Sequence, residues 1–142
     1  LDKDSRGLLL MTNNGDIINR MMRAANCHEK EYKVTVDREI TEDFLQRMSE
    51  GVAILDTVTR PCKVEKLGKY TFSIILTQGL NRQIRRMCEA LGYEVKDLVR
   101  VRVMNIRLGS LKEGQYRKLT DEELDELYGL IKDSPGGPSE KI

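Results

Sequence analysis

The sequence predicts an α+β fold in which helices flank a mixed, largely antiparallel sheet. Segments with alternating apolar residues, typical of half-buried strands, interleave along the chain with segments of helical periodicity. Their order does not follow the strand–helix–strand repeat that produces a parallel sheet. With 142 residues, the chain is long enough for one domain to bury a core without a disulfide or a metal ion.

The first elements are predicted between residues 8 and 25. An apolar run over residues 8–12 predicts a short buried strand, and the Asn-Asn-Gly sequence at 13–15 predicts a turn. A helix is predicted over residues 16–25, because the apolar residues there recur at helical spacing. These residues are Ile17, Ile18, Met21, Met22 and Ala25.

Two strands and a helix are predicted in the middle of the chain. Residues 31–36 alternate as a strand, and Thr41 can cap a helix that runs through residue 48. The expected buried residues are Tyr32, Val34 and Val36 in the strand and Phe44, Leu45 and Met48 in the helix. Residues 52–64 predict a loop with short strands, and residues 70–77 predict a clear strand. One face of that strand carries Phe72, Ile74 and Leu76.

The strand over 70–77 should end at Gly79, and a helix is predicted over residues 81–91 before Gly92 terminates it. The apolar stripe of this helix consists of Ile84, Met87, Cys88 and Leu91. Residues 93–108 contain a further strand. In it, apolar and basic residues alternate as Val99, Arg100, Val101, Arg102 and Val103.

Thr120 opens the last helix with a capping box to Glu123, in which each residue can bond the other's backbone N–H. Its expected core face consists of Leu124, Leu127, Tyr128 and Ile131. Residues 1–133 are therefore predicted to form one domain. Residues 134–142, which include Ser-Pro-Gly-Gly-Pro-Ser, are predicted to be a flexible tail.

The composition argues against several classes of protein. The cysteines, Cys27, Cys62 and Cys88, are odd in number and widely spaced, and His28 is the only histidine. This pattern predicts reduced thiols in a cytoplasmic protein, with no zinc or other metal site. The longest apolar run, residues 8–11, is too short to cross a membrane. A chain that opens on Leu1 is expected to be cut from a longer protein.

The net charge of +1 conceals an uneven distribution of charged residues. Residues 113–142 contain four Lys or Arg and eight Asp or Glu, whereas residues 81–107 contain seven basic and three acidic residues. A neutral protein with one basic face is compatible with nucleic-acid binding, although such runs are commonly solvated surface.

The segment over residues 79–87 is the most informative for chemistry, because it follows a predicted strand and opens a predicted helix. Arg82, Arg85 and Arg86 lie three and four residues apart and should cluster on adjoining parts of one helix face. Their charges repel each other and oppose the helix dipole, so a phosphate backbone or a buried carboxylate would compensate them. An ordinary basic helix surface is the alternative.

Two other segments contain candidate residues, each with a simple structural alternative. Asp2 and Asp4 precede a glycine and a predicted strand, which also describes a plain polar loop. Tyr32 lies in a Lys-Glu-Tyr-Lys-Val sequence at 30–34, where it is also explained as a half-buried strand residue.

Together these segments resemble the bacterial pseudouridine synthase family that includes RsuA, RluB, RluE and RluF. Residues 1–8 and 12–16 match its Leu-Asp-x-x-(Thr/Ser)-x-Gly-Leu and Thr-Asn-x-Gly-Asp patterns. Residues 30–34 match Lys-x-Tyr-x-Val, and residues 79–87 match Gly-x-Asn-Arg-Gln-Ile-Arg-Arg-Met. The resemblance extends to about residue 132 and is greatest to the RluF type. The family's preceding Gly-Arg, a Lys-Pro-containing strand and a small N-terminal RNA-binding domain are absent, so the catalytic fold would be incomplete at the N-terminus.

The resemblance implies an isomerase that converts a specific uridine in RNA to pseudouridine without a cofactor. By this likeness Asp2 is the catalytic carboxylate, as nucleophile or as base, Arg85 is its ion-pair partner, and Tyr32 stacks on the flipped-out base. The implied RNA-binding residues are Asn81, Arg82, Arg86 and Lys30.

The implied substrate is a bacterial ribosomal RNA stem-loop, in the large subunit (23S), with transfer RNA as a second candidate. The intact enzyme is expected to be a monomer, and self-association of this shorter chain is left open, as is its own activity. A non-catalytic RNA-binding or ribosome-associated module is the alternative function. A metal-dependent nuclease is disfavoured, because the acidic residues do not have metal-ligand spacing.

Overall fold

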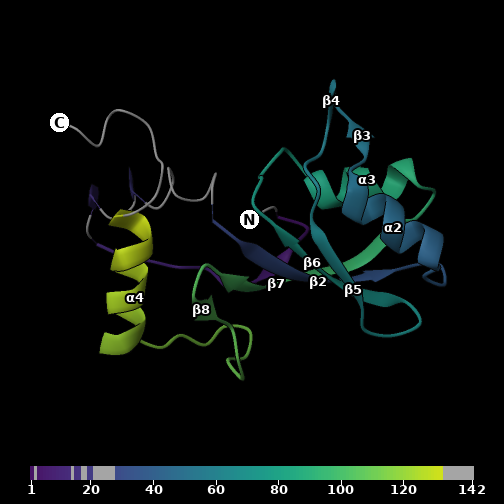
Figure 1. Ribbon diagram of the computed structural model, residues 1–142. Helices are drawn as coiled ribbons and strands as arrows, with labels where there is room; N and C mark the ends of the chain where they lie inside the picture. Colours follow the sequence, from purple (N-terminus) through teal and green to yellow (C-terminus); the bar gives the residue numbers. More distant parts are fainter. Residues whose placement is uncertain (2, 14, 17–18, 21–27, 133–142) are drawn as a thin grey trace.

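A computed structural model describes residues 1, 3–13, 15–16, 19–20 and 28–132 of the chain. Its centre is a six-stranded sheet with the order β1-β7-β2-β6-β5, and β8 pairs with β7 (Figure 1). The strands are β1 (Arg6–Gly7), β2 (Lys30–Val36), β5 (Lys63–Lys66), β6 (Thr71–Leu76), β7 (Val95–Val103) and β8 (Ile106–Arg107). Pairing is antiparallel throughout this sheet except between β1 and β7. The predicted α+β class with a largely antiparallel sheet is confirmed.

Helices α2 (Glu42–Glu50) and α3 (Gln83–Ala90) lie on the same side of the sheet (Figure 1). A hairpin of β3 (Ala53–Ile54) and β4 (Thr57–Val58) projects beside them, in the region predicted to be a loop with short strands. Helix α4 (Asp121–Lys132) stands apart from both, near β8. No helix in the described part of the chain is long and apolar enough to span a membrane.

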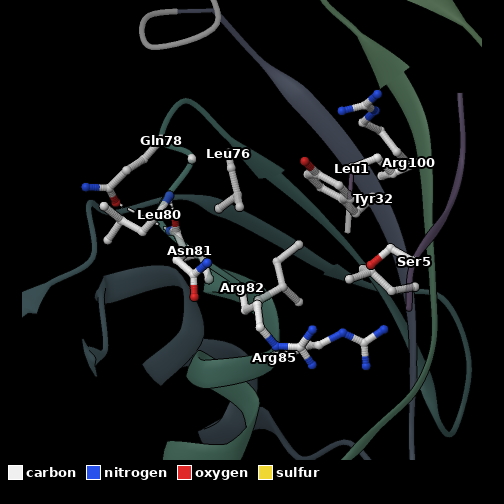
Figure 2. A pocket seen from close by; sticks show the side chains of 14 residues that line it. Leu1, Ser5, Tyr32, Leu76, Gln78, Leu80, Asn81, Arg82, Arg85 and Arg100 are labelled. Atoms are coloured by element: carbon white, nitrogen blue, oxygen red, sulfur yellow. Dashed lines mark hydrogen bonds between the residues drawn. The ribbon is translucent and has the colours of Figure 1, made fainter. Parts of the chain in front are cut away.

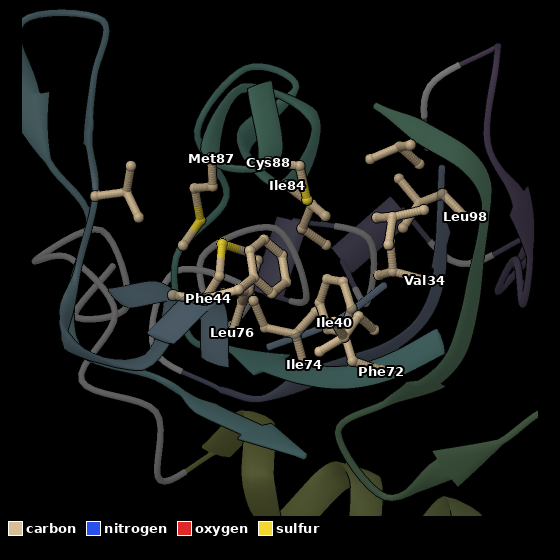
Figure 3. Packing of buried hydrophobic residues seen from close by; sticks show 14 of the residues in the cluster. Val34, Ile40, Phe44, Phe72, Ile74, Leu76, Ile84, Met87, Cys88 and Leu98 are labelled. Carbon is tan, nitrogen blue, oxygen red and sulfur yellow. The ribbon is translucent and has the colours of Figure 1, made fainter. Parts of the chain in front are cut away.

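The main core lies between the sheet and the helices α2 and α3 (Figure 3). Phe44 of α2 meets Phe72 of β6 edge to face, with 5.4 Å between the ring centroids, and lies 4.1 Å from the ring of Tyr93. The side chain of Thr41 accepts a hydrogen bond from the backbone N–H of Phe44, so the predicted N-cap of α2 is confirmed. The apolar faces predicted for β2, α2 and β6 all contribute to this core.

The strand predicted over residues 8–12 is wrong, because the strand in this region is Arg6–Gly7. Leu8 still donates its N–H to the carbonyl of Arg100 at 2.8 Å, but the Leu8 carbonyl accepts from the Arg100 guanidinium at 2.7 and 2.9 Å. The Arg100 side chain therefore binds the backbone carbonyl that would continue the pairing of this segment with β7, and β8 pairs with the C-terminal end of β7 instead. Leu8 is buried nonetheless.

The helix predicted over residues 16–25 is described only in part. Gly15, Asp16, Asn19 and Arg20 are helical. The apolar residues that predicted this helix lie outside the described residues, as do Cys27 and the tail over 134–142.

A second, smaller core lies under α4 and consists of Leu8, Val103, Met104, Ile106, Leu127 and Ile131. The predicted capping box is confirmed, since Thr120 N–H donates to Glu123 Oε1 at 2.9 Å and Glu123 N–H to Thr120 Oγ1 at 3.1 Å. Tyr128 was expected in the core but is 45% exposed. Leu130 packs against this core instead, because the buried stripe of α4 passes through 127, 130 and 131.

Candidate active site

A cavity of about 230 Å³ opens where the N-terminal segment meets the sheet and α3. Leu1 and Ser5 contribute from the N-terminal segment, Tyr32 from β2 and Arg100 from β7. Residues 78–85, which form the β6–α3 loop and the first turn of α3, line the remaining side (Figure 2). Three of the segments that the sequence singled out therefore meet at one place.

Helix α3 starts two residues later than predicted. Its N-cap is Arg82, which has a left-handed backbone (φ 48°, ψ 38°) and makes no side-chain capping bond. Gln83 supports the preceding loop from inside, because its side chain is buried and accepts the N–H of Leu80 at 3.1 Å. Gln78 extends this support, since its Oε1 accepts the N–H of Arg60 at 3.1 Å.

Arg82, Arg85 and Arg86 do not form the single cluster that their spacing predicted. Arg85 donates from Nη2 to the carbonyl oxygen of Asp4 at 2.6 Å, and Arg82 Nη1 lies 3.3 Å from the Asp4 carboxylate. Arg86 turns the other way and binds the carbonyl and side-chain oxygens of Asn81 at 3.0 and 2.9 Å. Arg82 and Arg85 line the cavity, and Arg86 does not.

A register shift in the sheet sets the position of Tyr32. The pairing of β2 with β7 is irregular between Glu31 and Tyr32, so that Tyr32 stands opposite Arg100 while Glu31 stands opposite Arg102. Tyr32 consequently lines the cavity while also packing against the main core. This agrees with both readings of Tyr32 made from the sequence.

Lys30 is 9% exposed at the start of β2 and does not line the cavity. A Cβ placed on Gly79 would lie 3.5 Å from the Lys30 ammonium, so this lysine lies beneath the β6–α3 loop. Burial lowers the pKa of Lys30, and the positive charge of Arg100 lowers it further. Lys30 therefore lies close to the cavity wall, in surroundings that disfavour its charged form.

Arg100 and Ser5 are among the lining residues that the sequence did not single out for the site. Arg100 follows the same alternation as surface residues of β7 and gave no distinguishing signal. Ser5 stands at the Thr/Ser position of the matched pattern, which was a usable signal. Within the described part of the chain, the Ser5 hydroxyl and Nε of Arg85 are buried without a hydrogen-bond partner.

Asp2 lies outside the described residues. Residues close to it in the sequence lie at the site, because Leu1 and Ser5 line the cavity and Asp4 contacts Arg85 of α3 and its N-cap, Arg82. In the described part of the chain, no group of three or more His, Cys, Asp or Glu could hold a metal ion.

Residues 1–90 match the family model described as RNA pseudouridylate synthase. The chain belongs to the RNA pseudouridylate synthase family. This match includes every residue that the sequence suggested for the site.

Curated relatives and a solved structure agree with this family. The chain is 58% identical over 134 residues to the dual-specificity RNA pseudouridine synthase RluF of Escherichia coli (strain K12), covering 94% of this chain and 46% of that protein. It is 36% identical over 136 residues to the ribosomal large subunit pseudouridine synthase B of Bacillus subtilis (strain 168), covering 92% of this chain and 56% of that one. A pseudouridylate synthase crystal structure matches with a TM-score of 0.82 and 34% identity, over 89% of this chain and 56% of that chain. The chain thus spans about half the length of these pseudouridine synthases.

Proposed function

We propose that this chain provides the catalytic domain of a bacterial enzyme that isomerises a uridine of ribosomal RNA, in the large subunit, to pseudouridine. The observation that carries the proposal is that Tyr32 and Arg85 line one cavity together with Leu1 and Ser5, which lie one position before and three positions after Asp2 in the sequence. These residues come from three separate parts of the sequence. A module that only bound RNA would not need a carboxylate facing the start of α3.

The reaction needs no cofactor, because atoms and electrons balance within the nucleotide. The bond from N1 of uracil to C1′ of ribose breaks, and a bond from C5 to C1′ forms. C5 loses its hydrogen as a proton, and N1 gains one. Asp2 would act as nucleophile or base in this sequence, and both roles are chemically suitable for a carboxylate.

Arg85 and Tyr32 would support Asp2 in different ways. A carboxylate in a partly dry pocket stays ionised more easily beside a cation, and the guanidinium of Arg85 is half-buried at the cavity wall. The ring of Tyr32 offers a flat surface on which a flipped-out base can stack. The volume of about 230 Å³ lies below the range of about 300–1,000 Å³ typical of sites for larger ligands, which suits a single base.

RNA would contact the start of α3 and the loop before it. Asn81, Arg82 and Arg86 would hold phosphates around the extruded nucleotide, and Lys30 would add positive charge from below. Arg86 is oriented by Asn81 through two hydrogen bonds, so these two residues would act together. The partner proposed is a stem-loop of ribosomal RNA, with transfer RNA as a second candidate.

The test compares the wild-type protein with Asp2→Asn on ribosomal RNA and maps pseudouridine by carbodiimide primer extension. The complete gene product is used, so that any residues beyond these 142 are present. The wild type should introduce a new pseudouridine, and Asp2→Asn should not. Asp43→Asn is the matched control, because Asp43 pairs with Arg47 on the exposed side of α2 and should leave activity unchanged.

Two further variants test the division between catalysis and RNA binding. Arg85→Ala should mainly lower kcat, whereas Arg86→Ala should mainly raise KM for RNA. An unchanged pseudouridine map with wild-type protein would remove the proposed function. If both arginine variants changed kcat and KM equally, only the assignment of catalysis to Arg85 and of RNA binding to Arg86 would be wrong.

A further inference from the structure

Asp4 makes two different contacts with the start of α3. Its carbonyl oxygen accepts a hydrogen bond from Arg85 at 2.6 Å, and its carboxylate lies 3.3 Å from a guanidinium nitrogen of Arg82. One contact uses the backbone and the other uses the side chain. Together they fix both the position and the rotation of the segment around Asp4 relative to the helix.

Arg82 is held in an unusual backbone conformation where it meets Asp4. Its φ of 48° lies in the left-handed region, which residues with a side chain adopt at a cost. The surroundings enforce it, because the Arg82 carbonyl accepts the N–H of Arg86 at 3.0 Å and the Gln83 side chain holds Leu80. The guanidinium of Arg82 is thus presented to Asp4 from a backbone position that the loop fixes.

Arg6 and Leu8, which follow Asp4 in this segment, are attached to the sheet. Arg6 makes two hydrogen bonds to Asp97 at 2.8 and 3.1 Å, and Leu8 exchanges bonds with Arg100. Among the described residues, Asp4 is therefore the point where this segment is joined to the helix. It lies two positions after Asp2 in the sequence.

We propose that Asp4 is a positioning residue, whose side chain clamps the segment carrying Asp2 onto Arg82 at the start of α3. The inference rests on the proposed function, because it assigns a purpose to the clamp within that site. Asp4 does not touch substrate in this proposal. Its carbonyl keeps Arg85 in place, and its carboxylate keeps the segment from moving away from the helix.

A competing role would make Asp4 an occupant of a phosphate site. In that case its carboxylate would only neutralise Arg82 until RNA arrives, and its removal would strengthen RNA binding. The two roles predict opposite results. The clamp predicts a lower kcat with little change in KM, whereas the phosphate substitute predicts a lower KM with kcat unchanged.

The experiment uses Asp4→Asn, which removes the charge but keeps the backbone carbonyl, in the complete gene product. We expect kcat to fall at least fivefold with KM within about twofold of wild type, because a displacement of about 1 Å at a catalytic group can cost about 100-fold. Asp4→Glu keeps the charge and should retain more of kcat than Asp4→Asn. Asp43→Asn removes a comparable exposed ion pair on α2 and should change neither constant.

A second readout does not depend on activity. Amide hydrogen exchange over residues 3–8 should become roughly two- to fivefold faster in Asp4→Asn, the range that an exposed ion pair supports. Asp43→Asn should leave it unchanged. The double variant Asp4→Asn/Arg82→Gln should exchange no faster than the faster of the two single variants, because both remove the same contact.

Three results would contradict the positioning role of Asp4. Unchanged exchange in Asp4→Asn, additive effects in the double variant, or a lower KM with unchanged kcat would each overturn the clamp. A wild-type protein that forms no pseudouridine would refute the proposed function instead. The exchange measurement would then still support or overturn the clamp by itself.

Discussion

Gly7 should not tolerate any side chain, and Gly7→Ala should detach β1 from β7. The φ of Gly7 is +123°, a conformation that residues with a Cβ rarely adopt. A Cβ at this position would overlap the backbone nitrogen and oxygen of Arg100 and lie 2.9 Å from its carbonyl carbon. These are main-chain atoms of a central strand, so no rotamer change can make room.

The magnitude follows from the contacts that β1 would give up. Backbone strain alone costs about 1–3 kcal/mol. Full detachment would expose Leu8, now 6% exposed, at about 1.5–3 kcal/mol, and would break its bonds to Arg100 at about 1 kcal/mol each. Because the overlap involves main-chain atoms, we expect Gly7→Ala to lower the free energy of unfolding by about 3–5 kcal/mol.

Urea denaturation measures this loss, and Gly92→Ala is the matched control. Gly92 also has a positive φ, +85°, but a Cβ there would meet nothing within 4 Å. Gly92→Ala therefore carries only the strain of a left-handed residue, about 1–2 kcal/mol. Pseudouridine formation should be lost in Gly7→Ala and kept in Gly92→Ala, since Gly7, unlike Gly92, belongs to the segment that reaches the cavity.

This prediction is wrong if Gly7→Ala unfolds at the same urea concentration as Gly92→Ala and retains its activity. Such a result would mean that β1 can move away from β7 without cost. Full activity with a large loss of stability would instead show that the cavity does not depend on β1.

Three further predictions concern the core, the acid stability and the thiols. Phe44→Ala should lower the free energy of unfolding in urea by about 3–5 kcal/mol, because Phe44 is 2% exposed at the centre of the core. The Arg6 guanidinium lowers the pKa of the Asp97 carboxyl group. The stability that this pair contributes is therefore complete above the ordinary carboxyl pKa of about 4, and it is lost as the pH falls through the lowered pKa of Asp97. Asp97→Asn should remove that part of the acid dependence in unfolding curves measured from neutral to low pH. Burial raises the pKa of Cys62 to about 11 and that of Cys88 to about 12, so peptide mapping should find both unmodified by iodoacetamide in the native protein at neutral pH, and modified after unfolding.

The elements that could be predicted from the sequence are those whose signals are local. Strands β2 and β6 alternate without interruption, and the cap of α2 depends on Thr41 and a backbone N–H three residues away. The run over residues 8–12 was assigned wrongly because an apolar sequence shows burial but not hydrogen bonding. The side chain of Arg100, 92 positions from Leu8, ends that strand, and no local pattern contains this information.

The residues of the site could be predicted in part, but the directions of their side chains could not. Tyr32 and Arg85 came from the resemblance to a family, and the structure places both at one cavity. The different directions of Arg82 and Arg86 were not predictable, because residues at this spacing share a face in a regular helix. Arg82 is left-handed and precedes the first turn, which separates its side chain from that of Arg86.

The start of α3 differs from those of the other long helices in a way that bears on function. Helix α2 has Glu42 and Asp43 in its first turn and a side-chain cap, and α4 has three acidic residues and a capping box. Helix α3 has no acidic residue in its first turn and no side-chain cap. The positive charges of Arg82 and Arg85 at this end are met instead from another segment, by the carboxylate and the carbonyl of Asp4. A helix that depends on another segment for this charge has a sequence poorly suited to stability alone, which is the pattern expected where a site must bind an anionic partner. The proposed RNA phosphates and the proposed catalytic segment would thus depend on the same end of α3.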